Sequence, residues 1–168
     1  MKRDDRHLLY IAFFFPPSRA SGVYRAIATA NAFSQQGWRV TVLTADERFF
    51  HQEIATADNT LLASVSDDVA LFRVPFTFQK VTKEDITRYG WFKANYFRVF
   101  LKIQSLVSNL FYFRKKERTP FSKYGDWIKP ATTTAKEIHA KDPFCHILAT
   151  GNPFASFEAA LNLHNELG

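Results

Sequence analysis

The chain has 168 residues, 46% of them hydrophobic, and a formal net charge of +6. A chain of this size can bury a proper core as one domain, so it should fold by itself. Its single cysteine, Cys145, excludes an internal disulfide, favours a cytoplasmic location and is predicted to be a core residue rather than a nucleophile. No run of about 18 uncharged apolar residues occurs, so no membrane-spanning helix is predicted.

The first predicted elements form a βαβ unit. Residues 7–14 are a continuous apolar run, typical of a strand buried on both faces of a parallel sheet, and residues 39–44 are a second strand rich in β-branched side chains. Between them lies one helical stripe of apolar residues. Ser21 is placed to cap the start of this helix and Gly37 to end it in a left-handed conformation. The crossover between the strands should be right-handed.

The rest of the chain continues to alternate helices and strands. The predicted elements are a poorly patterned helical stretch at 47–65, a strand at 69–74, mostly helical residues 79–118, a helix at 124–140, a strand at 144–150 and a helix at 153–167. This order predicts an α/β, Rossmann-like three-layer sandwich with a mainly parallel sheet. We expect residues 1–168 to be a single domain of a longer protein, because an open four-stranded parallel sheet normally continues. A genuinely short protein is the alternative.

The loop after the first strand is a candidate substrate site. It reads PPSRASG and leads into a helix whose free N–H groups form an anion site. Ser21 and Gly22 would let a phosphate or a sugar approach the backbone closely. Pro17 and Arg25 complete this predicted loop, and Arg25 either meets a phosphate or forms a surface salt bridge. The alternative is that prolines and glycines here are ordinary turn formers.

The loop after the fourth strand is the second candidate. Thr150, Gly151, Asn152 and Pro153 are again small or polar residues at a helix start. If the first and fourth strands are neighbours, the two loops face one crevice at the carboxyl edge of the sheet. The dinucleotide fingerprint and the P-loop pattern are absent, which disfavours a nicotinamide enzyme and a nucleotide triphosphatase. The five histidines show no metal-ligand spacing, so no metal site is expected.

The excess positive charge lies in one segment. Residues 79–118 hold ten lysines and arginines against three acidic residues, a net charge of +7, and apolar residues repeat there at alternating spacings of four and three. A basic helix of this kind can lie on an anionic membrane surface, or its stripe can pack on the sheet. A nucleic-acid role is not expected, because no known motif is present. The cations predicted to face a membrane are Lys93, Arg98, Lys102, Arg114, Lys115 and Lys116.

The stretch LLYIAFFFPPSRASGVYRAIATANAFSQQGWRVTVLTA resembles the opening of glycosyltransferase family 4 enzymes, which are retaining transferases with the two-domain GT-B fold. The matching features are a strand that ends in Phe-Pro-Pro, the motif Gly22-Val23-x-Arg25, Gly37-Trp38 and the strand that follows. The resemblance returns more weakly at Asp126-Trp127 and at ILATGNPFASFEAALNLHNELG. Many members have two adjacent glycines in the first loop, and this sequence retains only one of them.

The resemblance implies that this chain is the N-terminal, acceptor-binding domain of an enzyme that transfers a sugar from a nucleotide-sugar donor to a glycan or lipid-linked acceptor, in the cytoplasm or at the inner face of the membrane. The donor would bind a C-terminal domain absent from this chain, so the isolated domain should be inactive. The nucleotide-sugar is a substrate, and no cofactor is expected. Many members have a histidine after the fourth strand where this chain has Thr150-Gly151, so no catalytic residue is assigned. The alternative is a non-catalytic membrane-surface or scaffolding module with the same fold.

Overall fold

The computed structural model describes residues 6–77, 90–91, 95–96, 98–100, 102–103, 106–107 and 124–168. The chain forms two compact units, one made of Met1–Thr77 with Tyr124–Gly168 and the other of Phe78–Lys123. The first unit contains the sheet. In the second unit, every described residue between 90 and 107 is helical.

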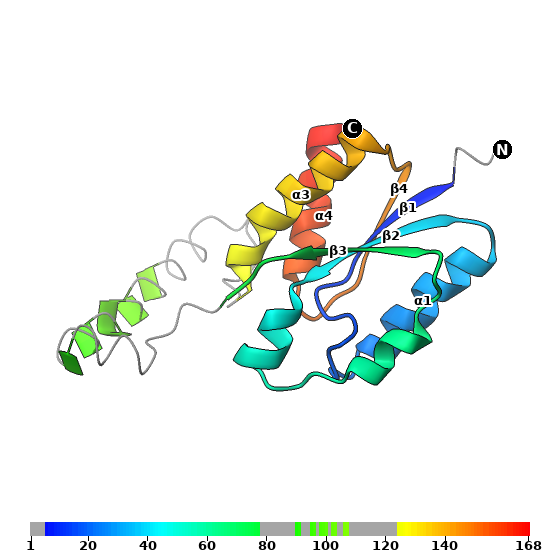
Figure 1. Cartoon of the computed structure of the whole chain (residues 1–168). Helices are drawn as coiled ribbons and strands as arrows, with labels where there is room; N and C mark the ends of the chain where they lie inside the picture. Colours follow the sequence, from blue (N-terminus) through cyan, green and yellow to red (C-terminus); the bar gives the residue numbers. More distant parts are fainter. Residues whose placement is uncertain are drawn as a thin grey trace. The chain divides into compact units, whose positions relative to one another are not determined.

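The first unit is built on a four-stranded sheet in which every strand pairs in parallel (Figure 1). Its strands are β1 (His7–Ile11), β2 (Arg39–Ala45), β3 (Val69–Val74) and β4 (His146–Ala149), in the order β3-β2-β1-β4. In the register of the central strand, Leu9 lies opposite Thr41 on one side and Ile147 on the other. The α/β class and the parallel sheet are therefore confirmed. β1 and β4 are shorter than the apolar runs that predicted them.

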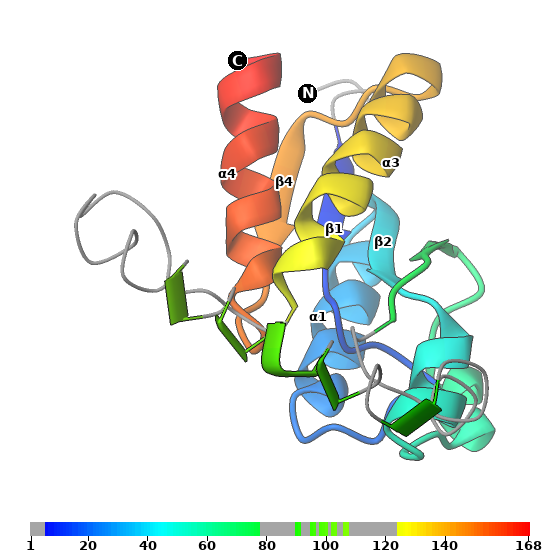
Figure 2. The ribbon, with the colours of Figure 1, turned by 90° about the vertical axis from the view of Figure 1, so that its left-hand side faces the viewer.

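Helices cover both faces of this sheet (Figures 1 and 2). α1 (Val23–Gln35) packs on one face, where Ala26 and Ile27 join a core cluster with Tyr10 and Val42. α3 (Ile128–Lys141) and α4 (Ala155–Leu167) pack against each other on the other face. The unit is a Rossmann-like layered fold, as the alternation of strands and helices predicted.

Two predicted helical regions differ in the structure: residues 47–65 contain only short turns, and the helix expected at 124–140 starts later. Residues 47–65 hold a π-helical turn at Phe49–Glu53 and a 3-10 helix at Asn59–Ser64. The helix expected from residue 124 begins at Ile128, after a 3-10 turn at Gly125–Trp127. Burial accounts for both differences. Phe49 and Phe50 of the π-helical turn and Trp127 of the 3-10 turn are packed in the core.

An aromatic cluster fills the space at the carboxyl end of β1. Phe13 is fully buried at its centre. The centroid of its ring lies 4.9 to 5.4 Å from five other rings, mostly edge to face: Phe14, Phe49, Phe76, Tyr124 and Trp127. Edge-to-face contacts at this distance add to the stabilisation from burial alone. This cluster supports the loop that follows β1.

α1 ends as the sequence predicted, with Gly37 in the left-handed region at φ +79°. The N–H of Gly37 donates to the carbonyl of Ser34, and that of Trp38 donates to the carbonyl of Phe33 at 3.0 Å. The rings of Phe33 and Trp38 pack at 5.5 Å between centroids. This pair of bonds and the accompanying apolar contact form a Schellman motif.

We expect Gly37→Ala to lower the free energy of unfolding by about 1 kcal/mol, because an L-residue with a Cβ is disfavoured by about 1–2 kcal/mol in the left-handed region. Direct steric clash adds nothing, since no atom lies within 4 Å of the added Cβ. Gly125→Ala is the matched control, because its Cβ also meets open space and its φ is not in that region. Urea denaturation measures both. Equal losses in the two variants would contradict this account of Gly37.

Candidate functional site

The two predicted loops lie at the point where the chain reverses its direction across the sheet. From β1 the chain proceeds outward to β2 and β3, and it then returns to β4 on the other side of β1. In open α/β sheets, ligands bind outside the carboxyl ends of the strands at such a reversal. The expectation that the first and fourth strands are neighbours is confirmed. We call residues 12–25 and 150–157, which include the first residues of the helix that follows each loop, the edge loops.

A side-chain contact joins the edge loops. Nη2 of Arg25, in the first turn of α1, donates to Oγ1 of Thr150 at 3.5 Å. Tyr10 in β1 is buried beside them. Burial raises the pKa of Tyr10, while hydrogen bonding with Thr150 and Thr29 and the charge of Arg25 act in the opposite direction. A cation and several hydroxyl groups therefore converge at this edge.

Within the first edge loop, the predicted residues differ in exposure. Pro17 is buried, and its carbonyl accepts from the N–H of Asp58 at 2.6 Å. Ser18 is also buried, and its hydroxyl accepts from the N–H of Ala20. Ser21, in contrast, is exposed. Pro17 thus anchors the loop to a neighbouring segment, whereas Ser21 is accessible to a ligand.

The start of α1 differs from the prediction. The helix begins at Val23, with Gly22 at the capping position and no side-chain hydrogen bond. The predicted cap by Ser21 is therefore wrong, because Ser21 lies one residue too early to reach the first free N–H groups. Gly22 has an ordinary φ of −76°, and a Cβ there would meet only Nη2 of Arg25, at 3.9 Å. Its missing side chain leaves open space next to Arg25.

The second edge loop begins as an extension of the sheet. The N–H of Thr150 donates to the carbonyl of Ile11 at 3.1 Å. Asn152 follows with φ +63°, a left-handed conformation that asparagine tolerates better than most residues, and its bond to the buried Pro153 is cis. The left-handed conformation of Asn152 turns the chain from the strand towards α4.

Two exposed aromatic rings at the second edge loop were not predicted. Phe154 is 66% exposed and Phe157 is 45% exposed, and their ring centroids are 6.1 Å apart. A Cβ on Gly151 would lie 2.9 Å from the ring of Phe157, so the glycine makes room for this ring. The sequence signal that could have predicted these rings is a pair of phenylalanines, three residues apart, immediately after a polar loop.

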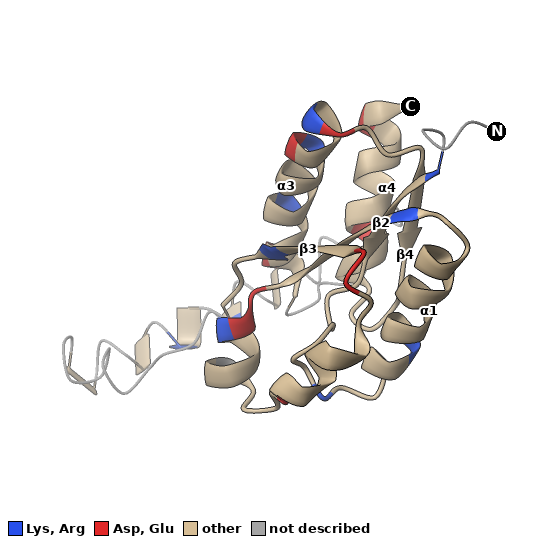
Figure 3. Cartoon of the chain, turned by 45° about the vertical axis from the view of Figure 1, so that its right-hand side comes forward, with Lys and Arg blue, Asp and Glu red and all other residues tan. Residues whose placement is uncertain are grey.

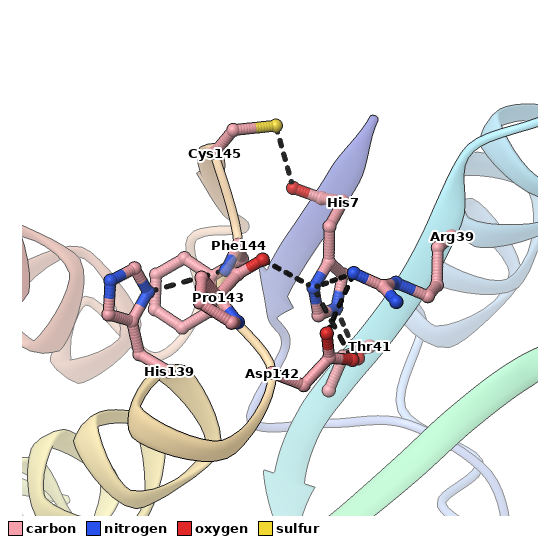
Figure 4. A network of polar contacts seen from close by, with 8 residues as sticks. All are labelled: His7, Arg39, Thr41, His139, Asp142, Pro143, Phe144 and Cys145. Atoms are coloured by element: carbon pink, nitrogen blue, oxygen red, sulfur yellow. Dashed lines mark hydrogen bonds and ion pairs between the residues drawn. The ribbon is translucent and has the colours of Figure 1, made fainter. Parts of the chain in front are cut away.

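A buried polar network lies at the amino end of β1 (Figure 4). The side chain of His7 is 1% exposed, with Nδ1 3.0 Å from the carbonyl of Pro143 and Nε2 2.8 Å from Oγ1 of Thr41. Arg39 forms an ion pair with Asp142 at 2.7 Å and lies 3.2 Å from Nδ1 of His7. We assign the proton to Nδ1, which then donates to the carbonyl, while Nε2 accepts from the hydroxyl.

This network is structural in character. Burial lowers the pKa of His7, and the charge of Arg39 lowers it further, while the bond to Pro143 and the charge of Asp142 raise it. The neutral imidazole links the first residue of β1 to β2 and to the turn before β4. The network stands at the end of β1 opposite to the edge loops, so we assign it no part in their site.

A pocket of about 490 Å³ lies at the free edge of β4, where α3 and α4 end. His139, Cys145, Leu161 and His164 are among its lining residues. Cys145 is exposed, so its predicted core position is wrong; β4 is an edge strand, and residues beside an edge strand are covered on one side only. Among the residues that the structure describes, no group of His, Cys, Asp and Glu could hold a metal ion.

The predicted membrane-facing cations are only partly described. Arg98 and Lys102 are helical and exposed. The other four lie outside the described residues: Lys93, Arg114, Lys115 and Lys116. No helix in the described part of the chain is long and apolar enough to cross a membrane.

Comparisons with protein-family models, with curated proteins and with solved structures found no match to this chain. The arrangement of the edge loops is therefore the main structural observation from which a function can be inferred. These loops present a cation, hydroxyl groups and exposed aromatic rings, which are groups that bind and orient a ligand.

Proposed function

We propose that this chain is the acceptor-binding half of a retaining GT-B sugar transferase, with the edge loops as one wall of the acceptor site. The observation that carries the proposal is the contact between Arg25 and Thr150, which joins the two loops at the reversal point of a parallel sheet. The resemblance of residues 8–45 to glycosyltransferase family 4 supports it independently.

The chemistry of the edge loops fits an acceptor that carries both sugar hydroxyls and phosphate. Arg25 supplies a positive charge for a diphosphate, and the exposed Ser21 and the Thr150 hydroxyl supply hydrogen bonds to sugar hydroxyls. The exposed rings of Phe154 and Phe157 supply apolar contact. A lipid-linked glycan has all three features, and we favour it as the acceptor class.

In the proposed reaction, the bond between the donor sugar and its nucleotide diphosphate breaks and a bond to an acceptor oxygen forms, with loss of the acceptor proton. The present chain positions the acceptor, and a second domain binds the nucleotide-sugar. Positioning of two bound reactants removes much of the entropic part of the barrier, and fixed charges stabilise the departing diphosphate. Attachment at the inner face of a membrane would bring the enzyme to a lipid-linked acceptor.

The alternative is a non-catalytic membrane-surface or scaffolding module. The observation in its favour is the set of exposed apolar side chains between residues 90 and 107. A transferase that acts at a membrane would use the same side chains, so a further observation has to separate the two functions. A ligand bound at the edge loops separates the two hypotheses.

We expect Gly22→Trp to weaken acceptor binding by about tenfold, equivalent to about 1.4 kcal/mol, because the indole fills the open space next to Arg25. The backbone at Gly22 is not strained, so the variant should fold. The probe is a short-chain prenyl-diphosphate-linked N-acetylglucosamine, titrated while the backbone amide signals are followed by NMR. Wild-type shifts should cluster at residues 20–25 and 150–152.

Gly22→Ala is the matched control, since its Cβ meets only one atom at 3.9 Å and should leave the affinity unchanged. If the tryptophan variant bound the probe with wild-type affinity, or if the shifts were confined to other parts of the chain, the edge loops would not be part of the acceptor site. Sugar transfer by the protein that carries both domains then tests the reaction itself.

A further inference from the structure

The second unit exposes large apolar side chains that the proposed function does not use. The described residues between 90 and 107 are all helical, and their large apolar side chains are 47% to 75% exposed. These side chains are Trp91, Tyr96, Val99, Phe100, Ile103, Leu106 and Val107. Proteins rarely expose a contiguous apolar patch unless a partner covers it.

Their spacing in the sequence predicts that most of them share one side of a helix. With 3.6 residues per turn, the six after Trp91 fall within an arc of about 120°. We call these six the apolar arc. Arg98 and Lys102 fall outside it, adjacent to one of its borders, and both are exposed.

Charge distinguishes the candidate partners of this surface. Residues 79–118 carry a net charge of +7, while the rest of the chain carries −1. In the first unit, basic and acidic residues are interspersed (Figure 3). A second copy placed on the apolar arc would bring two strongly positive segments together, which is unfavourable. An anionic surface, in contrast, would neutralise the positive charge of this segment.

We propose that the described helical residues between 90 and 107 dock on an anionic bilayer surface. The apolar arc lies at the boundary between headgroups and acyl chains, and Arg98 and Lys102 contact the anionic headgroups. Trp91 and Tyr96 suit this boundary because each combines an apolar ring with a polar group. The docking combines apolar burial with electrostatic attraction, which is the usual basis of interfacial helix binding. It does not depend on sugar transfer.

The test is co-sedimentation of the full chain with lipid vesicles. The chain should bind vesicles that contain about 30% phosphatidylglycerol in phosphatidylcholine and should bind pure phosphatidylcholine at least tenfold more weakly. A rise in ionic strength from about 0.1 M to about 1 M should release a large part of the bound protein, because salt screens the attraction. Absence of sedimentation with the anionic vesicles overturns the proposal.

Variants separate the contribution of apolar burial from that of electrostatic attraction. Phe100→Asp with Ile103→Asp should weaken binding at least tenfold, whereas Leu161→Asp with Leu167→Asp adds the same charge at exposed apolar positions of α4 and should have a smaller effect. Arg98→Gln with Lys102→Gln should weaken binding by about fivefold for each cation removed. Lys129→Gln with Lys141→Gln, two exposed lysines of α3, is the matched control for charge.

Tryptophan fluorescence locates the contact independently of the variants. Of the three tryptophans, Trp91 is 62% exposed, Trp127 is fully buried and Trp38 is partly buried. Brominated anionic lipid should quench the emission of the wild type, and Trp91→Phe should remove most of that quenching. The proposal is overturned if the variant with Phe100→Asp and Ile103→Asp binds anionic vesicles as well as the wild type does. It is also overturned if light scattering shows a stable dimer held by these side chains.

Discussion

Phe13→Ala should lower the free energy of unfolding by about 3–5 kcal/mol, the largest effect that we expect from a single substitution. Phe13 is fully buried, and its ring contacts five other aromatic rings. The substitution removes the apolar burial and leaves a cavity that five rigid rings can refill only in part. It also removes the edge-to-face contacts.

Urea denaturation monitored by far-ultraviolet circular dichroism measures this loss. Phe154→Ala is the matched control, because the same side chain is removed from a position that is 66% exposed, and it should change the free energy by less than about 0.5 kcal/mol. A loss below about 1.5 kcal/mol for Phe13→Ala would show that the cluster repacks and does not hold the carboxyl end of β1 rigidly.

The second large effect is a loss of stability in mild acid through His7. Burial lowers the pKa of His7 from the ordinary value of 6.5. Below pH 6.5 the unfolded chain therefore binds a proton that the folded chain does not, and stability falls as the pH falls. The loss approaches about 1.4 kcal/mol per pH unit until the folded-state pKa is reached. Above pH 6.5 this contribution is fully present.

Urea denaturation at several pH values between 5.5 and 7.5 measures the slope. This window stays above the region in which Asp46 and Asp58, whose pKa values are lowered from 3.8, would contribute. His7→Gln retains a side chain that can bond to Thr41 and cannot be protonated, so the difference in stability between the ends of the window should shrink by about 1 kcal/mol. An unchanged slope would assign the acid sensitivity to other groups.

Proposals about ligands depend on contacts that no local pattern contains. Arg25 and Thr150 are separated by 125 positions in the chain, and they meet because β1 and β4 are neighbours. The sequence predicted a shared crevice only on the condition that these strands pair. The buried position of Pro17 and the exposed rings of Phe154 and Phe157 also depend on the surrounding segments, and neither was predicted.

The local features of the fold were determined by the sequence alone. Apolar runs of β-branched residues predicted β2 and β3, and Gly37 predicted the end of α1, because each depends on the conformation and burial of a few consecutive residues. Only the tertiary structure decided the strand order, the exposure of Cys145 at an edge strand and the network around His7. These depend on segments far apart in the chain, and the pattern of one segment does not specify which others it will contact.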